Sequence, residues 1–307
     1  MSGKKPTARG IVRRVDPSVK AKGADETFVP DYTVTSTTDN GCQLLTNVEV
    51  ILCFWGSFWS SNPPPTPSSD EYKQAIEGIL TGPFLGALSQ YRGAGQASLV
   101  YSTINDGTDP ANNYTDADVV AMLKDQFQNN ASMPVPTAGH QRFYAVILPV
   151  GINNSLQDAG QHQSLTYNGV TAWYAWVDNS GSLTGHDCVT KVFSHELVEA
   201  CTNPNVDTSN DGILVDGKSG TTTFTNDEIG DTCNNQFATV DMNGVQCSVQ
   251  SYWSKADNAC ILPLGTLSFW VDKNTFGKNE VQDVITSGGT WQQAFWLVVE
   301  GGHLEQP

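Results

Sequence analysis

The stretch S-H-E-L-V-E-A-C, residues 194–201, places one histidine and two glutamates inside an otherwise apolar segment. On an α-helix, residues i and i+4 lie one turn apart on the same face, so His195 and Glu199 would stand side by side. Imidazole nitrogen and carboxylate oxygen are both ligands of zinc. The stretch therefore predicts a helix that carries a metal site, with the rest of the chain organised around it.

Glu196 follows His195 directly and would be turned about 100° away from it around the helix. Zinc peptidases with an H-E-x-x-H helix keep their general base at this position. In this chain a glutamate replaces the second histidine, which zinc coordination chemistry allows. We therefore predict that His195 and Glu199 bind zinc and that Glu196 is the general base. The alternative is an amphipathic helix whose apolar residues face the core while its charges are solvated.

A second acidic stretch, D-E-I-G-D-T-C at residues 227–233, follows the predicted helix. In one large class of zinc peptidases, a downstream glutamate supplies the third ligand, and an acid one turn further on hydrogen-bonds the metal-bound histidine. Glu228 and Asp231 have the i, i+3 spacing that this arrangement needs. We expect Glu228 to bind the metal and Asp231 to orient His195; the alternative is an acidic surface turn.

The segments H-E-L-V-E-A-C-T-N-P at 195–204, E-I-G-D-T-C at 228–233 and V-Q-S-Y-W-S-K-A-D-N-A-C at 249–260 resemble a family of bacterial and fungal H-E-x-x-E proteins. That family is similar to the plant EXORDIUM (phosphate-induced) proteins. V-E-V-I-L-C-F-W-G at 48–56 and G-P-F-L-G-A-L-S-Q-Y at 82–91 extend the resemblance. It implies a zincin-like, metallopeptidase-type fold. The plant members keep the T-N-P segment without the His-Glu pair, which leaves catalysis open.

Composition limits the classes of partner. Charged residues make up 16% of the 307 residues, and the net charge is −16. This acidic balance argues against binding to nucleic acid or to anionic membrane surfaces. No apolar run reaches the roughly 18 residues of a membrane span. The polar, lysine-poor composition favours an extracellular protein, yet no secretory signal is visible, so the compartment stays open.

The order of predicted elements favours an α+β fold, with a zincin-like mixed sheet, packed helices and an active-site helix. Strands are expected at 47–56 and 142–150, the latter central, and a hairpin turn is expected at Asn168-Gly169. Capping residues open helices at Ser68 and at Thr115. The expected organisation is a polar N-terminal arm at 1–45, a metal-binding domain at 46–262 and a small β-rich segment at 263–307.

The strand before the active-site helix, at 172–176, is a candidate for the sheet edge beside the cleft, where a peptide substrate could add as a further strand; the alternative is that its aromatic residues pack in the core or on the sheet. Tyr174 and His186 are candidates to stabilise a transition state, and His186 also to provide an extra metal ligand. Three further histidines are most simply surface residues: His140, His162 and His303.

The seven cysteines contain no C-x-x-C pair, which argues against a cysteine-rich zinc knuckle. One disulfide is expected within a loop-rich region that contains Cys233, Cys247 and Cys260. Asp207 and Asp211 resemble the start of a calcium loop, with an ordinary polar turn as the alternative.

These observations together predict a zinc-dependent hydrolase that cleaves peptide bonds with Glu196 as general base. The alternative is a non-catalytic extracellular or cell-surface binding protein with a structural metal or none. The substrate and the oligomeric state stay open, as does the extent of the natural chain beyond Pro307.

Overall fold

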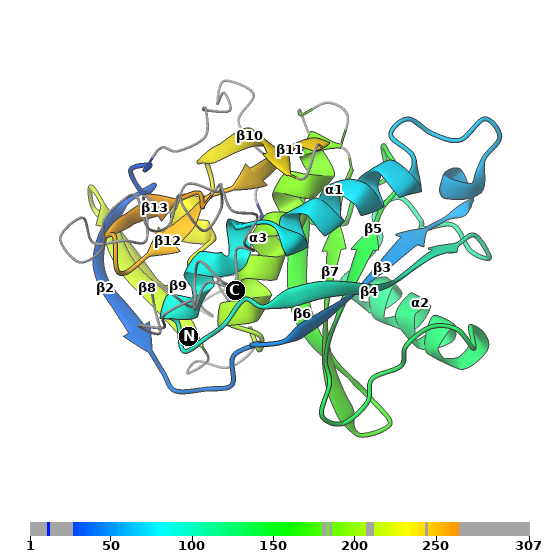
Figure 1. Ribbon diagram of the computed structural model, residues 1–307, viewed down its shortest axis with the longest axis horizontal. Helices are drawn as coiled ribbons and strands as arrows, with labels where there is room; N and C mark the ends of the chain where they lie inside the picture. Colours follow the sequence, from blue (N-terminus) through cyan, green and yellow to red (C-terminus); the bar gives the residue numbers. More distant parts are fainter. Residues whose placement is uncertain are drawn as a thin grey trace, which may run out of the picture.

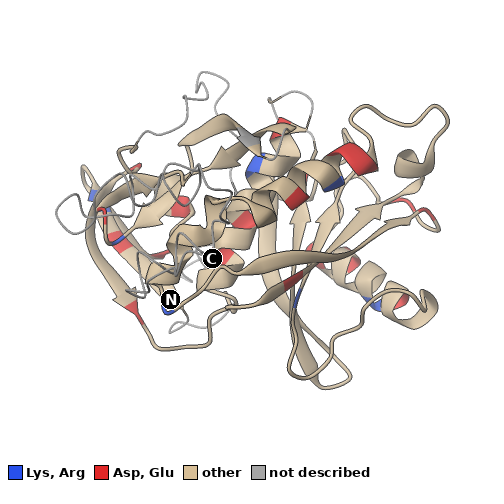
Figure 2. Ribbon diagram, in the orientation of Figure 1, with Lys and Arg blue, Asp and Glu red and all other residues tan. Residues whose placement is uncertain are grey.

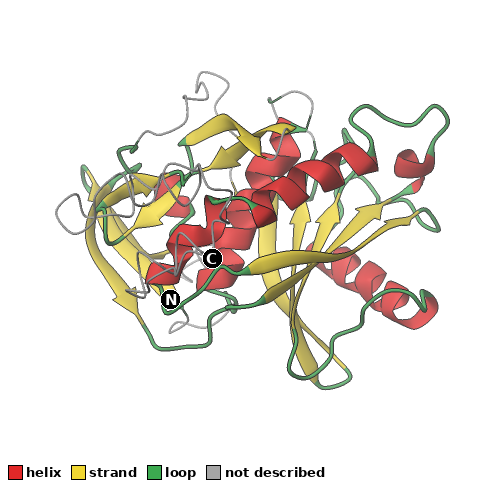
Figure 3. Cartoon of the chain, in the orientation of Figure 1, coloured by secondary structure: helices red, strands yellow, loops and turns green. Residues whose placement is uncertain are grey.

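The computed structural model describes residues 11–12, 27–179, 183, 186–206, 212–242 and 245–263. These residues form a mixed α+β structure in which helices cover both faces of a six-stranded sheet and three smaller sheets lie to one side (Figures 1 and 3). None of the described helices is both long enough and apolar enough to cross a membrane. The expected β-rich segment at 263–307, apart from residue 263, and the possible calcium loop at Asp207 and Asp211 lie outside the described residues.

The main sheet has the strand order β1-β6-β7-β5-β3-β4, which places β5 in its interior as predicted. Four strands are parallel: β3 (Val48–Trp55), β4 (Ala97–Asn105), β5 (Gln141–Ile147) and β7 (Val170–Val177). Two strands complete the sheet as antiparallel neighbours, β6 (Gly160–Tyr167) beside β7 and the short β1 (Ile11–Val12) beside β6.

The central strands are apolar on both faces because both faces are covered by helices. In β3, Val50, Leu52 and Phe54 pack in one core cluster with α1 (Ser69–Thr81) and α3 (Asp187–Thr202). The alternate residues of β3 pack in a second cluster with α2 (Asp116–Asn129). The two faces of the sheet therefore carry separate cores, and only the face under α3 is adjacent to the H-E-x-x-E residues.

The predicted helix starts are confirmed. The Ser68 side chain accepts a hydrogen bond from the Glu71 backbone, and the Glu71 carboxylate accepts one from the Ser68 backbone, which is a capping box. Thr115 and Asp118 form the same box at the start of α2. Two 3₁₀-helices also form, η2 (Phe84–Gln90) after α1 and the shorter η1 (Ser57–Ser60) after β3.

The predicted hairpin is also confirmed and sets the edge of the sheet. Asn168 and Gly169 have positive φ angles of 50° and 79°, as a two-residue hairpin turn requires, and they join β6 to β7. Because β6 folds back on the outer side of β7, the segment at 172–176 lies between two strands. The expectation that this segment forms the edge was wrong, and β6 lies nearer to the edge.

Short antiparallel strands form the three smaller sheets. β2 (Thr33–Asp39) lies within the expected N-terminal arm and pairs with β8 (Ile213–Ser219), which pairs with β9 (Thr222–Asp227). Two further pairs follow, β10 (Phe237–Met242) with β11 (Val245–Gln250) and β12 (Tyr252–Ser254) with β13 (Ala259–Ile261). The arm therefore contributes a strand to the domain through long-range pairing.

One disulfide forms within the predicted set of cysteines, between Cys233 and Cys260. It joins the short 3₁₀-helix η3 (Asp231–Cys233) to β13, and Cys247 is buried in β11 outside this bond. The bond fixes the chain directly after the acidic turn at 228–231.

We expect the double substitution Cys233→Ser, Cys260→Ser to lower the free energy of unfolding by roughly 3 kcal/mol, because the bond closes a loop between residues 27 apart in sequence. Urea unfolding of oxidised protein measures this difference. Cys42→Ser, which leaves the bond intact, is the control and should stay near wild type. Equal stability of the double variant and the wild type would mean that the bond does not form.

Candidate metal centre

The helix α3 is enclosed by protein on all sides. It packs against β6 and β7 of the main sheet, against β11 and against α1. All its residues from Cys188 to Thr202 are buried, and His195, Glu196 and Glu199 are at most 1% exposed. The alternative of an amphipathic helix with solvated charges was therefore wrong. Figure 2 shows acidic positions along both α1 and α3, where basic positions are sparser.

The side chain of His195 faces two carboxylates and one amide. Its Nε2 atom lies 3.0 Å from Glu199 Oε1 and 3.7 Å from Asp231 Oδ1. Its Nδ1 atom lies 2.5 Å from the side-chain nitrogen of Gln250, at the end of β11. The amide nitrogen of Gln250 therefore donates to Nδ1, and the neutral ring carries its proton on Nε2, so a metal ion at Nε2 would require this proton to move to Nδ1 and the Gln250 amide to turn. Asp231 lies on the Nε2 side of the ring instead of the orienting position expected for it.

A second histidine, His162 of β6, lies in the same cluster. Its Nδ1 atom is 3.2 Å from Glu196 Oε2 and 3.6 Å from Glu199 Oε2. Its Nε2 atom is 3.0 Å from the Asn203 carbonyl oxygen and 3.6 Å from Glu228 Oε1. The expectation that His162 is a surface residue was wrong, since the side chain is fully buried.

The residue pairing of the hairpin explains this position. His162 lies opposite Ala175 in the hairpin. Ala175 and the residues two before and two after it, Trp173 and Val177, belong to the core cluster under α3. Side chains directly opposite each other in an antiparallel pair lie on the same face of the sheet. Counting back from the Asn168-Gly169 turn would thus have placed His162 beneath the H-E-x-x-E helix.

The three predicted ligands do not form a single group. Glu199 is shared between two groups of potential ligands, His195 with Asp231 and His162 with Glu228. Glu228 is held by Asn203, whose side-chain nitrogen donates to Glu228 Oε1 at 2.7 Å. Four residues of the cluster were thus among those predicted from the sequence: His195, Glu199, Glu228 and Asp231. His162, Gln250 and Asn203 were not.

Two other candidates lie elsewhere. The hydroxyl of Tyr174 donates to Asp116 at 2.6 Å, and its ring packs in the α2 core on the opposite face of the sheet. His186 precedes α3, contacts the Gln246 carbonyl oxygen and packs its ring against Tyr72. It is nine residues before His195, about 13 Å along the helix axis. Neither residue lies in position to stabilise a transition state at His195, nor is His186 an extra ligand there.

The electrostatics of the cluster follow from its burial. Desolvation, followed by repulsion from Glu228, raises the pKa of Glu199 well above its usual value. Desolvation also raises the pKa of Glu228 to about 7 and lowers the pKa of His195 well below its usual value. His195 is therefore neutral near pH 7, as a metal ligand must be. Burial therefore disfavours the ionised forms of Glu199 and Glu228.

Several atoms of the cluster make no hydrogen bond within the described part of the chain: His195 Nε2, Glu199 Oε2 and Glu228 Oε2. Buried polar atoms without partners are uncommon in folded proteins. The contacts of 3.0–3.7 Å between imidazole nitrogens and carboxylate oxygens are close to the separation of about 3.3–3.6 Å between two ligands of one tetrahedral zinc ion. The residues present therefore fit a metal ion.

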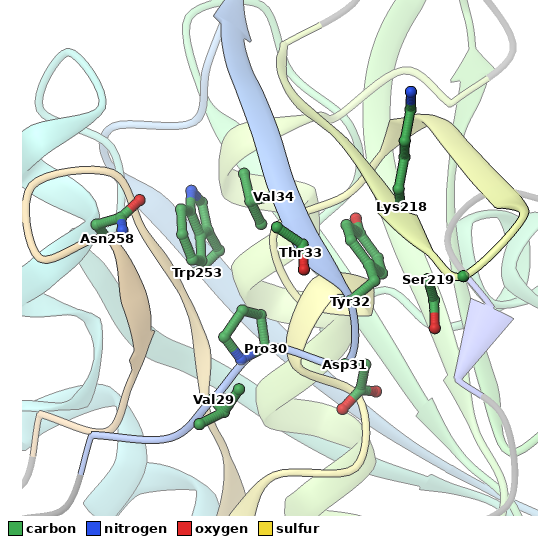
Figure 4. A pocket seen from close by; sticks show the side chains of 11 residues that line it. Val29, Pro30, Asp31, Tyr32, Thr33, Val34, Lys218, Ser219, Trp253 and Asn258 are labelled. Atoms are coloured by element: carbon green, nitrogen blue, oxygen red, sulfur yellow. The ribbon is translucent and has the colours of Figure 1, made fainter.

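A groove of about 490 Å³ lies beside the turn that carries Glu228 and Asp231 (Figure 4). It is lined by the segment at 29–34, the turn at 218–220, Trp253 and Asn258. From its wall, Tyr32 places its hydroxyl 3.0 Å from Asp227 Oδ2 and 2.9 Å from Thr232 Oγ1. Tyr32 thus connects the wall of this groove to the turn that carries Glu228 and Asp231.

Comparisons of the chain with protein-family models, curated proteins and solved structures found no significant match.

Gly230 gives a test of how tightly the cluster is packed. Its φ angle of −73° suits any residue, but an added Cβ would lie 2.7 Å from Glu199 Oε1 and 3.0 Å from His195 Nδ1. We expect Gly230→Ala to destabilise the protein by about 1–3 kcal/mol, the usual result of overpacking. Gly86→Ala, where an added Cβ meets nothing within 4 Å, is the matched control and should change stability by less than about 0.5 kcal/mol. Equal unfolding midpoints for the two variants would contradict this packing.

Proposed function

We propose that the chain is a metal-dependent hydrolase that cleaves peptide bonds, with a zinc ion bound by α3 and the turn at 228–231. The single observation that carries the proposal is the buried cluster of four carboxylates and two imidazoles, several of whose atoms have no hydrogen-bond partner among the described residues. A mixed sheet with an antiparallel strand beside the H-E-x-x-E helix supports a zincin-like fold for the same domain.

The charge of the cluster supports a cation more strongly than the sequence motif does. Moving one unpaired ionised group into a protein interior costs several kcal/mol. Lys191, a buried cation on α3, makes no hydrogen bond through Nζ to any residue that the structure describes, and it lies 5.7 Å over the ring of Phe237. It therefore does not neutralise the carboxylates by direct pairing, and a bound metal ion would do so.

The residues divide into binding and proton-transfer roles. His195, Glu199 and Asp231 converge with neutral imidazole and carboxylate atoms, which suits zinc. Zinc bound there would lower the pKa of an adjacent water toward 7. Glu196 would accept the proton of that water and pass it to the leaving amine. His162 lies on the same side of the helix, with its Nδ1 atom 3.2 Å from Glu196 Oε2.

One observation favours a second candidate function, a non-catalytic binding protein with a structural ion. Structural zinc sites are closed by protein ligands, whereas catalytic sites keep a position open for water and substrate. The near-complete burial of His195, Glu199 and Glu228 is typical of the first kind. Activity measurements on matched variants distinguish the two candidates.

Metal removal should destabilise the protein under either function. An ion that binds only the folded chain adds about 4 kcal/mol of stability when its concentration is 1,000 times its Kd. We therefore expect a strong chelator to lower Tm, zinc to restore it, and Glu199→Ala to abolish the difference. Elemental analysis of protein purified without added metal gives the ion content. Unchanged Tm and no bound metal would rule out the site.

Glu196→Gln distinguishes enzyme from structural site. The substitution keeps the size of the side chain and removes the base, so metal content and Tm should stay close to wild type. Hydrolysis of a cleaved member of a peptide library should fall roughly 10²–10⁴-fold. Glu77→Gln, on the exposed surface of α1, is the control and should keep full activity. If wild type loaded with zinc cleaves no peptide, the hydrolase is excluded and the structural ion remains.

A further inference from the structure

We propose that the cluster is a two-metal centre in which the carboxylate of Glu199 bridges two divalent cations. The inference rests on the metal site proposed above and extends it by a second ion, with His162 as the ligand that the sequence motif does not contain. The two ions would occupy the two groups that share Glu199, His195 with Asp231 and His162 with Glu228.

The two oxygens of Glu199 face different imidazoles. Oε1 lies 3.0 Å from His195 Nε2, and Oε2 lies 3.6 Å from His162 Nδ1. A carboxylate that gives one oxygen to each of two ions fits the separation of about 3.5–4 Å found in two-metal hydrolytic sites. If only one ion were bound through Oε1, Glu199 Oε2 would stay buried without a hydrogen-bond partner.

The hydrogen bonding of His162 selects the nitrogen that can bind metal. The Asn203 carbonyl oxygen, 3.0 Å from Nε2, can only accept a hydrogen bond, so Nε2 carries a proton. In the neutral ring, Nδ1 then presents a lone pair to Glu196 Oε2 and Glu199 Oε2, which also carry lone pairs. A backbone carbonyl that fixes one imidazole nitrogen in this way is a common partner of metal-bound histidine.

The balance of charge also favours two ions. When all of them are ionised, Glu196, Glu199, Glu228 and Asp231 bring four negative charges. One divalent cation would then leave two of these charges without direct compensation, since Lys191 makes no hydrogen bond to them within the described residues. Two divalent cations neutralise all four. The three glutamates are fully buried, and the side chain of Asp231 is 15% exposed, so bulk water provides little of the missing compensation.

Metal stoichiometry of the full-length protein tests the inference. Chelator-treated protein is titrated with Zn²⁺ by calorimetry, desalted and measured by elemental analysis. We expect two ions per chain for wild type, one for His162→Ala, one for His195→Ala and none for Glu199→Ala. His140→Ala, which removes an exposed histidine paired with Glu49, is the matched control and should keep two ions.

A spectroscopic measurement on wild type tests the inference without any variant, so it applies even if the variants fail to fold. Wild type loaded with Mn²⁺ should show the electron paramagnetic resonance signal of an exchange-coupled pair, because the ions share one carboxylate. A single ion per wild-type chain, with an uncoupled signal, would overturn the two-metal centre while leaving the proposed hydrolase intact. Absence of any bound ion would overturn both proposals.

Discussion

The structure depends on the enclosure of a charged helix. The sheet, α1 and β11 surround α3, so Glu196 and Glu199 lie where a globular domain usually places apolar side chains. Each unpaired ionised group there costs several kcal/mol, against a net stability of about 5–15 kcal/mol for a whole domain. The fold therefore needs either protons or cations on these carboxylates. Binding of the metal ion that we propose would therefore be coupled to folding, whichever chemistry the ion serves.

Two parts of the domain must approach α3 closely to build the cluster. From the main sheet, Gly160 of β6 lies so near that an added Cβ would be 2.8 Å from Glu196 Oε1. From the opposite side, a Cβ added to Gly230 would lie 2.7 Å from Glu199 Oε1. The disulfide between Cys233 and Cys260 ties the chain just after Gly230 to β13. The cluster therefore lies where the main sheet and the small antiparallel sheets meet. The main sheet contributes His162, and the turn after β9 contributes Glu228 and Asp231.

Local patterns in the sequence predicted the elements that depend on local interactions. The capping boxes at Ser68 and Thr115 and the turn at Asn168-Gly169 involve only neighbouring residues, and all three form as expected. The strands β8 to β11 were missed because they are short, rich in polar residues and paired with segments distant in sequence or across tight turns. Tyr174 was misplaced for a related reason. In β7 it alternates with residues that face α3, so it faces α2.

In the candidate site, too, the residues close in sequence were predicted together, whereas those brought in from distant strands were not. The helix spacing brought His195 and Glu199 together, and the i, i+3 spacing brought both acids of the 228–231 turn into the cluster. The position of Glu199 between two imidazoles could be seen only in the structure. A histidine at this position would offer one lone pair in one direction, whereas a carboxylate offers two oxygens, and those of Glu199 face His195 and His162 separately. Glutamate in place of the second histidine of H-E-x-x-H is thus what allows one helical residue to serve imidazoles on both sides.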